Sequence, residues 1–290
     1  IHFIGIGGIS MSSLAKFCLC ENKIVSGSDK NDSLIIKELI GLGVKVTVGE
    51  ADIESVKPDL VVYSSAISEN NEELKKAKSK NILILKRSEF LGEILKSFKE
   101  SICVCGCHGK TTTTAMLTHV FMRAESVPTA FIGGNDLIFK NFFYGEKDIA
   151  IAEACEYKKN FLDISPKTVI CTNVDLDHLD SYSGISDTIS TFESFVKGKQ
   201  SVINADDLYS SPLLKTCAIS YGIKKGNVRA TSIIPTIYGN SFSVLYNGKD
   251  LGRIEIKLKG LFNIYNALSV IACALLYKID FKIIKESLIK

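Results

Sequence analysis

The chain alternates between short apolar runs and segments in which apolar residues recur every three to four positions. Residues 59–63, 101–105 and 168–172 are apolar and rich in β-branched side chains, which is typical of buried strands. Segments such as residues 34–42 and 111–123 carry apolar positions at helical spacing. Strands that alternate with helices predict parallel sheets with right-handed crossovers.

The same pattern predicts the remaining elements. It starts with a strand, a glycine turn and a helix over residues 1–15. Further strands are expected over residues 23–28, 44–48, 82–85, 131–135, 148–152 and 200–204. Further helices are expected over residues 72–80, 89–99, 186–196 and 260–276, with a short one from residue 281. Residues 217–259 change to an alternation that predicts an antiparallel edge or small sheet.

The 290 residues are enough for two domains, each with its own core. We expect an α/β protein whose first domain, residues 1–97, is a Rossmann-like parallel sheet. We expect the second, residues 98–290, to be an α/β domain with a phosphate loop and a small antiparallel sheet.

The phosphate loop is predicted between the strand of residues 101–105 and the helix of residues 111–123. The motif Gly106-x-x-Gly109-Lys110-Thr111 fits a turn whose backbone N–H groups bind phosphate. Lys110 adds a positive charge that reaches terminal phosphates, and Thr111 adds a hydroxyl that ligates Mg²⁺. The full pattern has a glycine where this chain has Val104. The alternative is an ordinary glycine-rich turn with a surface lysine.

The first glycine turn, Gly5 to Gly8, also lies between a predicted strand and a predicted helix. Asp29 ends the next strand, at about the distance of the acidic residue that binds a ribose in dinucleotide-binding folds. Ser10 stands where the dinucleotide fingerprint has its third glycine, so a different nucleotide is plausible. The alternative is a turn without a ligand.

Acidic and polar residues follow two further strands of the second domain. Glu153 ends the strand of residues 148–152 and is a candidate Mg²⁺ ligand, with Glu156 a weaker one. Residues 173–180 place an asparagine, three aspartates and a histidine just past the strand of residues 168–172. The alternatives are a salt-bridge glutamate and an aspartate-rich helix cap.

Composition limits the classes of function. The net charge is +3 and no long Lys/Arg run is present, so a nucleic-acid partner is not expected. No apolar run reaches the length of a membrane span, and the N-terminus does not resemble a signal peptide. The nine cysteines lie among apolar residues, which predicts reduced, buried thiols in a cytoplasmic protein. Metal binding by Cys103, Cys105, Cys107 and His108 is a less favoured alternative.

Five motifs in order give the chain its resemblance to the Mur ligases. They are the runs of residues 5–15, 106–113, 153–156, 173–180 and 263–268. The resemblance implies three domains: a UDP-binding domain, a central ATPase domain and an amino-acid-binding domain. This chain corresponds to the first two, and the third is absent from it.

The resemblance implies an ATP-dependent ligase that joins L-alanine to the lactyl carboxylate of UDP-N-acetylmuramate through an acyl phosphate. It implies cytoplasmic peptidoglycan precursor synthesis with Mg²⁺, by a monomer or a homodimer. The implied contacts to the sugar nucleotide are Gly5, Gly7, Gly8, Ser10, Met11, Asp29, Ser64, Ser65, His108 and Asn135. The implied contacts to ATP are Gly106, Cys107, His108, Gly109, Lys110, Thr111, Thr112, Asn263 and Asn266. The implied metal ligands are Thr111, Glu153 and His178, and the implied catalytic residues are Lys110, Glu153 and His178.

Two residues depart from the family pattern. Cys107 replaces the usual threonine of the loop, and Phe262 replaces a histidine that usually precedes Asn263. Three alternative functions stay open: a sibling ligase that recycles muramyl peptides, a nucleotide-binding module without ligase activity, and an NAD-dependent oxidoreductase. Ser10 argues against the oxidoreductase.

Overall fold

The computed structural model describes residues 1–289, which divide into two compact units. The first contains Ile1–Ile94 and Phe131–Tyr144, and the second contains Leu95–Ala130 and the described residues from Gly145 onwards. The division falls in the last turn of α5 (Arg87–Lys96). No helix within residues 1–289 is both long and apolar enough to cross a membrane.

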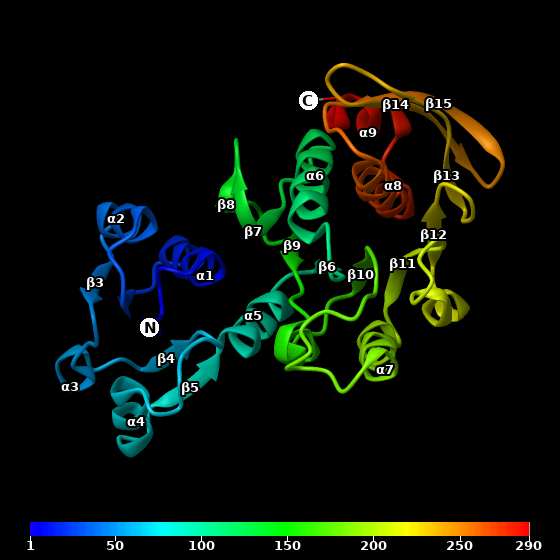
Figure 1. Cartoon of the computed structure of the whole chain (residues 1–290). Coiled ribbons are helices and arrows are strands. Elements are labelled where there is room, and N and C mark those ends of the chain that lie inside the picture. Colours follow the sequence, from blue (N-terminus) through cyan, green and yellow to red (C-terminus); the bar gives the residue numbers. More distant parts are fainter. Residues whose placement is uncertain (290) are drawn as a thin grey trace. The chain divides into compact units, whose positions relative to one another are not determined.

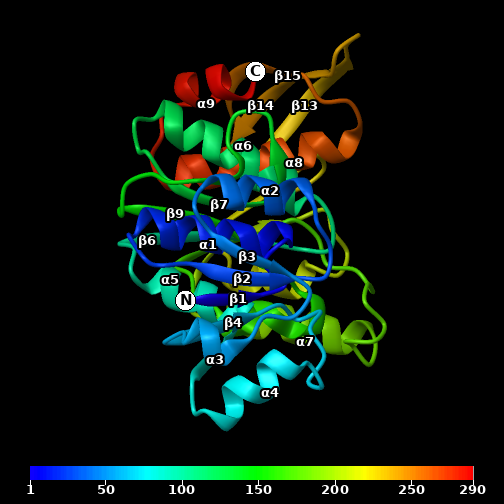
Figure 2. The same cartoon turned by 90° about the vertical axis from the view of Figure 1, so that its left-hand side faces the viewer.

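A five-stranded parallel sheet organises the first unit, in the order β3-β2-β1-β4-β5. Figure 1 shows α1 and α2 on one side of this sheet and α3 and α4 on the other. Because crossovers are right-handed, helices change sides where the strand order reverses, which is at β1. Figure 2 shows β2, β1 and β4 side by side. The bounds are β1 (His2–Ile4), α1 (Ile9–Cys20), β2 (Ser26–Asp29), α2 (Leu34–Gly41), β3 (Lys45–Val48), α3 (Ile53–Val56), β4 (Leu60–Tyr63), α4 (Glu72–Ser79) and β5 (Leu83–Lys86).

The segment Phe131–Tyr144 belongs to the first unit because it packs against α1. It contains β8 (Lys140–Phe143) and most of β7 (Thr129–Asp136). Asn141, 2% exposed, donates hydrogen bonds to the Ile9 carbonyl oxygen at 2.8 Å and to Ser12 Oγ at 2.9 Å. It accepts one from Lys16 Nζ at 2.9 Å. The strand expected over residues 131–135 lies within β7, and its glycines at 133 and 134 fit there because glycine also adopts extended backbone.

A mixed sheet organises the second unit, and its strands there follow the order β15-β14-β13-β12-β11-β10-β6-β9. Strands β9, β6, β10, β11, β12 and β13 pair in parallel. The expected antiparallel strands are confirmed and form the edge of this same sheet, as β13, β14 and β15. The strand bounds are β6 (Glu100–Cys105), β9 (Ile149–Glu153), β10 (Thr168–Cys171), β11 (Gln200–Asn204), β12 (Ile219–Gly222), β13 (Val228–Pro235), β14 (Asn240–Tyr246) and β15 (Lys249–Ile256).

Helices cover both faces of this sheet. Figure 1 shows α6 (Lys110–Arg123), α8 (Leu261–Leu276) and α9 (Phe281–Leu288) on one face and α7 (Ile185–Val196) on the other. The main core lies under the first three helices and includes Leu117, Val120 and Ile271, which are fully buried. Two 3₁₀ segments, Tyr157–Asp163 and Ser211–Thr216, were not expected from the sequence.

A buried polar pair links β1 to α4 in the first unit. His2 Nε2 lies 2.8 Å from Glu73 Oε2, and the two side chains are 1% exposed. The other ring nitrogen, Nδ1, lies 2.9 Å from Ser26 Oγ. Each polar atom of the imidazole is therefore satisfied inside the unit, so removal of one partner leaves a buried polar group without a hydrogen bond.

Replacing Glu73 with alanine is expected to lower the free energy of unfolding by about 2 kcal/mol. Glu72→Ala is the matched control, because Glu72 is also in the first turn of α4 and pairs with Lys75, three residues further on, where both side chains are half-exposed. Its loss should cost much less, because water screens an exposed ion pair. Urea denaturation followed by circular dichroism measures both. An equal loss of unfolding free energy in Glu73→Ala and Glu72→Ala would show that the buried pair does not stabilise the fold.

Candidate nucleotide-binding sites

The predicted phosphate loop connects β6 to α6, as the motif requires. β6 ends at Cys105, and α6 begins at Lys110 with Gly109 as its N-cap. The loop is therefore a strand–turn–helix junction whose free N–H groups lie at a helix N-terminus. Thr111 and Thr112 follow in the first turn of α6, where both are half-buried.

The end of β10 holds this loop from one side. Thr172 Oγ1 donates to the Cys105 carbonyl oxygen at 3.1 Å and to the His108 carbonyl oxygen at 2.7 Å. Asn173 accepts a hydrogen bond from the His108 N–H through Oδ1 at 2.9 Å and donates to the His108 carbonyl through Nδ2 at 3.0 Å. The His108 side chain is exposed, so this position is fixed through its backbone. Sequence reasoning placed Asn173 in a polar cluster but missed its contact with the loop.

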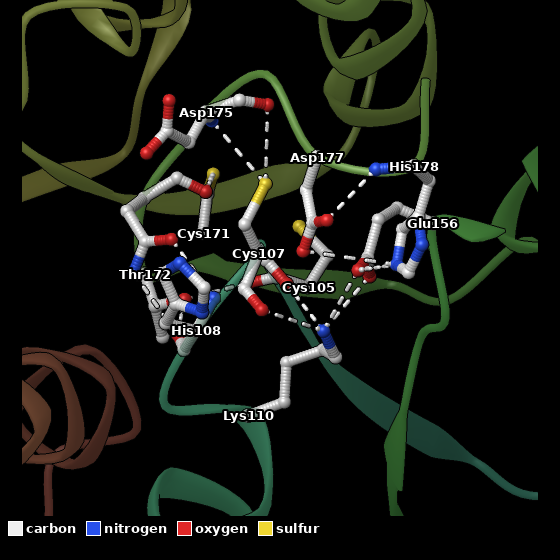
Figure 3. Close-up of polar contacts among 12 residues, drawn as sticks. Cys105, Cys107, His108, Lys110, Glu156, Cys171, Thr172, Asp175, Asp177 and His178 are labelled. Carbon is white, nitrogen blue, oxygen red and sulfur yellow. Dashed lines mark hydrogen bonds and ion pairs between the residues drawn. The ribbon is translucent and has the colours of Figure 1, made fainter. Parts of the chain in front are cut away.

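Cys107 is bound to the backbone after β10. Its Sγ accepts from the Asp175 N–H at 3.2 Å and donates to the Asp175 carbonyl at 3.3 Å, as Figure 3 shows. The side chain is 8% exposed. Burial raises the pKa of the Cys107 thiol to about 12. The cysteine in the place of the family threonine is thus a neutral hydrogen-bonding group.

Iodoacetamide is expected to alkylate Cys107 in the folded chain at pH 8.5 at least about a hundredfold more slowly than in urea, because the thiolate is the reacting form. The raised pKa means that the rate in the folded chain should still climb as the pH passes from 9 towards 12. Peptide mass spectrometry after timed quenching measures the rate. Cys20, which is exposed, is the internal control. Equal rates for Cys107 with and without urea would contradict the arrangement.

Lys110 extends from the start of α6 towards a buried carboxylate. Its Nζ lies 3.0 Å from Glu156 Oε1 and 2.9 Å from Oε2, and also donates to the carbonyl oxygens of Gly106 at 2.6 Å and Cys107 at 3.2 Å. Burial lowers the pKa of the Lys110 ammonium, but the Glu156 carboxylate and, less strongly, Glu153 raise it, and the net pKa lies above its ordinary value. The lysine is therefore a fixed positive charge at the loop.

His178 lies at the same carboxylate. Its Nε2 is 3.4 Å from Glu156 Oε1, and its ring packs edge-on against Tyr157 with centroids 5.0 Å apart. Figure 3 shows Lys110 and His178 both directed at Glu156. The backbone of His178 is left-handed, with a φ of +57°, which is uncommon for a residue other than glycine and is found at functional sites.

Glu153 and the two asparagines of α8 lie in the same unit. Glu153 is the last residue of β9, and β9 pairs in parallel with β6, so both strands end on the loop side. A Cβ atom on Gly109 would lie 2.4 Å from Asn266 Oδ1, which places Asn266 directly against the loop. Asn263 Oδ1 accepts a hydrogen bond from Asn266 Nδ2 at 3.1 Å.

The glycine turn of the first unit opens into a cavity of about 630 Å³. The cavity is lined by several residues predicted for the sugar nucleotide, namely Gly5, Gly7, Gly8, Asp29 and Ser64. The Asp29 carboxylate accepts a hydrogen bond from the Gly7 N–H at 2.8 Å.

Other residues predicted for the sugar nucleotide lie away from that lining. Met11 is 1% exposed in the core, and Ser65 is half-buried after β4. Ser10 Oγ accepts a hydrogen bond from Arg87 at 3.1 Å, a cation that sequence reasoning missed. Asn135 is exposed on β7 in the first unit, whereas the phosphate loop belongs to the second. Its predicted contact with the muramyl group therefore stays a prediction.

Both parts of the chain match known protein families. Residues 1–99 match the Mur ligase family catalytic domain, and residues 104–274 match the Mur ligase middle domain. The chain belongs to the Mur ligase family. It is 42% identical to the UDP-N-acetylmuramate–L-alanine ligase of Clostridium acetobutylicum over 99% of the chain. The chain spans 65% of that relative's length.

Two solved Mur ligase structures share the fold over 99% of the chain. The UDP-N-acetylmuramate-alanine ligase of Thermotoga maritima has a TM-score of 0.91 at 31% identity, and this chain covers 67% of it. The UDP-N-acetylmuramate:L-alanyl-gamma-D-glutamyl-meso-diaminopimelate ligase of Neisseria meningitides has a TM-score of 0.88 at 27% identity, and this chain covers 96% of it. The predicted α/β fold and family are thus confirmed.

Proposed function

We propose that this chain forms the sugar-nucleotide-binding and ATP-binding parts of a cytoplasmic ligase that joins L-alanine to the lactyl carboxylate of UDP-N-acetylmuramate. The reaction would serve peptidoglycan precursor synthesis. The observation that carries the proposal is the phosphate loop with Lys110 at its helix N-terminus, in a chain 42% identical to a ligase of that name. We propose two domains, residues 1–97 for the sugar nucleotide and residues 98–290 for ATP.

The proposed chemistry has two steps. A carboxylate oxygen of the sugar nucleotide attacks the γ-phosphorus of ATP, the bond to the β-phosphate oxygen breaks, and ADP leaves. The alanine nitrogen then attacks the acyl carbon of the acyl phosphate, inorganic phosphate leaves, and the nitrogen loses a proton. The first step brings two anions together, so Lys110 and the loop N–H groups would act by neutralising and orienting the γ-phosphoryl group.

The donor atoms near the loop suit Mg²⁺. Thr111 offers a hydroxyl and Glu153 a carboxylate, and Mg²⁺ is usually held by one or two such oxygens together with phosphates and waters. Within residues 1–289 no group of three or more His, Cys, Asp or Glu side chains could hold a metal alone, which agrees with a metal shared with the nucleotide. We propose that Thr111 and Glu153 hold one Mg²⁺ and that His178 holds a second. Each Mg²⁺ would neutralise part of the negative charge of the phosphates.

For the substrates, we propose that the turn of Gly5, Gly7 and Gly8 binds the pyrophosphate of UDP and that Asp29 binds its ribose. Arg87 would add a positive charge beside the same turn. Asn263 and Asn266 would contact adenine, and His108 and Asn135 the muramyl group. A monomer and a homodimer both fit this assignment.

Calorimetric titration of the chain with UDP-N-acetylmuramate and, separately, with ATP tests the proposal. We expect micromolar to millimolar binding of each and none of NADH. Binding of NADH in place of the sugar nucleotide would overturn the assignment of the first unit. The recycling ligase is the second candidate, because the Neisseria structure shares the fold with a TM-score of 0.88. A turnover assay of the full-length enzyme with L-alanine against the tripeptide separates the two.

A further inference from the structure

Glu156 is a buried acid between two basic side chains. It is 2% exposed, its carboxylate contacts Lys110 Nζ at 2.9 and 3.0 Å, and His178 Nε2 lies 3.4 Å away. Its position is fixed by the backbone, because its carbonyl oxygen accepts from Tyr182 OH at 2.6 Å and from the Lys159 N–H at 2.9 Å. Because the carboxylate is itself buried beside Lys110, a second anion that approaches this ammonium group meets the charge of Glu156 at close range.

Lys110 has no spare donor in this arrangement. An ammonium group carries three N–H donors, and its acceptors here are the Glu156 carboxylate and the carbonyl oxygens of Gly106 and Cys107. Figure 3 shows the amine turned to these groups. A phosphate that binds Lys110 must therefore displace at least one of them, and only Glu156 carries a charge.

We propose that Glu156 is a positioning residue that holds Lys110 beside the phosphate loop and competes with the terminal phosphates of the nucleotide for it. This rests on the proposed function, since the competing anion is ATP. Glu156 orients the lysine before binding and opposes the binding of the triphosphate. The opposition limits affinity for the nucleotide and eases release of the product.

Competition for Lys110 predicts that loss of the Glu156 charge raises the affinity for ATP, whereas a purely structural role predicts that it lowers this affinity. Glutamine at position 156 keeps the size of the side chain and a hydrogen-bond acceptor for Lys110 but removes the negative charge. The triphosphate then meets no buried like charge and recovers the full attraction of Lys110. Loss of a residue that only supports the loop would weaken binding instead.

The test measures the affinity of the 290-residue chain for ATP with EDTA present, by calorimetry, for wild type, Glu156→Gln and Glu156→Asp. We expect Glu156→Gln to bind ATP about tenfold more tightly than wild type, and Glu156→Asp, which keeps the charge, to stay within about threefold of wild type. Glu286→Gln is the matched control. It removes an ion pair from the other end of α6, where Glu286 Oε2 lies 2.6 Å from Arg123, and should leave affinity unchanged.

Each outcome decides a different point. Unchanged or weaker binding by Glu156→Gln, with wild type binding normally, would overturn the role of Glu156 and leave the proposed function intact. If neither wild type nor Glu156→Gln binds ATP although both give native circular dichroism spectra, the proposed function and this inference are both overturned. Tighter binding by both Glu156→Gln and Glu286→Gln would show a general charge effect and would also overturn the role of Glu156.

Discussion

Replacing Lys110 with alanine is expected to weaken the binding of ATP by about a hundredfold or more, which corresponds to about 2.7 kcal/mol. The ammonium group is a fixed charge at the helix N-terminus, and its contacts with terminal phosphates would be charge-assisted hydrogen bonds. The same substitution leaves the Glu156 carboxylate buried beside the loop without its partner. It should therefore also lower the free energy of unfolding by about 3 kcal/mol.

A second variant separates these two effects. Lys110→Ala combined with Glu156→Gln removes both charges, so we expect most of the stability to return while affinity for ATP stays far below that of wild type. Calorimetry with ATP measures binding, and urea denaturation measures stability. ATP binding by Lys110→Ala at near wild-type affinity, in a folded chain, would contradict the phosphate-binding role of the loop.

The phosphate loop was predictable because all its requirements are local. An apolar strand, two spaced glycines, the Lys110–Thr111 pair and an amphipathic helix stand next to each other in the sequence, and the structure has them as β6, the turn and α6. The alternation of strands and helices likewise predicted the α/β class. Both predictions depend on how residues are spaced over short stretches of the sequence, and the periodicity of apolar and polar residues shows this spacing directly.

The strand order was not predictable in the same way. The β-rich alternation after residue 217 indicated antiparallel strands but left open whether they form a separate sheet. They extend the main sheet because Tyr221 and Gly222 of β12 pair in parallel with Val228 and Arg229 of β13. That pairing depends on contacts across the sheet. The packing of β8 on α1 depends on the contact of Lys16 with Asn141, which are 125 residues apart.

The partner of Lys110 also depends on tertiary structure. Glu153 is the last residue of β9 and Glu156 follows three residues later, and the sequence favoured Glu153 as the one at the site. The chain turns after β9 through Lys158 and Lys159, whose φ angles of +50° and +57° are unusual for lysine. This turn follows Glu156, whose side chain is buried beside Lys110. The metal and adenine assignments of Glu153, Asn263 and Asn266 remain predictions.

Replacing Gly106 with alanine is expected to lower the free energy of unfolding by at least about 3 kcal/mol and to abolish ATP binding. The φ of Gly106 is +131°, a conformation that side-chain-bearing residues rarely adopt. A Cβ atom there would lie 2.0 Å from Thr172 Oγ1, 2.9 Å from the Asn173 carbonyl oxygen and 3.0 Å from its nitrogen. Removing the Thr172 hydroxyl would not relieve the clash, because the Asn173 backbone and the φ angle remain.

Gly198→Ala distinguishes this clash from the general cost of a left-handed residue. Gly198 lies in the same unit with a φ of +74°, but a Cβ atom there would meet no heavy atom within 4 Å. Its replacement should cost only about 1–2 kcal/mol and leave ATP binding intact. Urea denaturation and calorimetry compare the stability and the ATP affinity of Gly106→Ala and Gly198→Ala. The difference between the two variants measures how much the close contact between the loop and the end of β10 contributes to each. Equal stability of the two variants, with ATP bound by both, would show that Thr172 and Asn173 do not hold the loop where the structure has it.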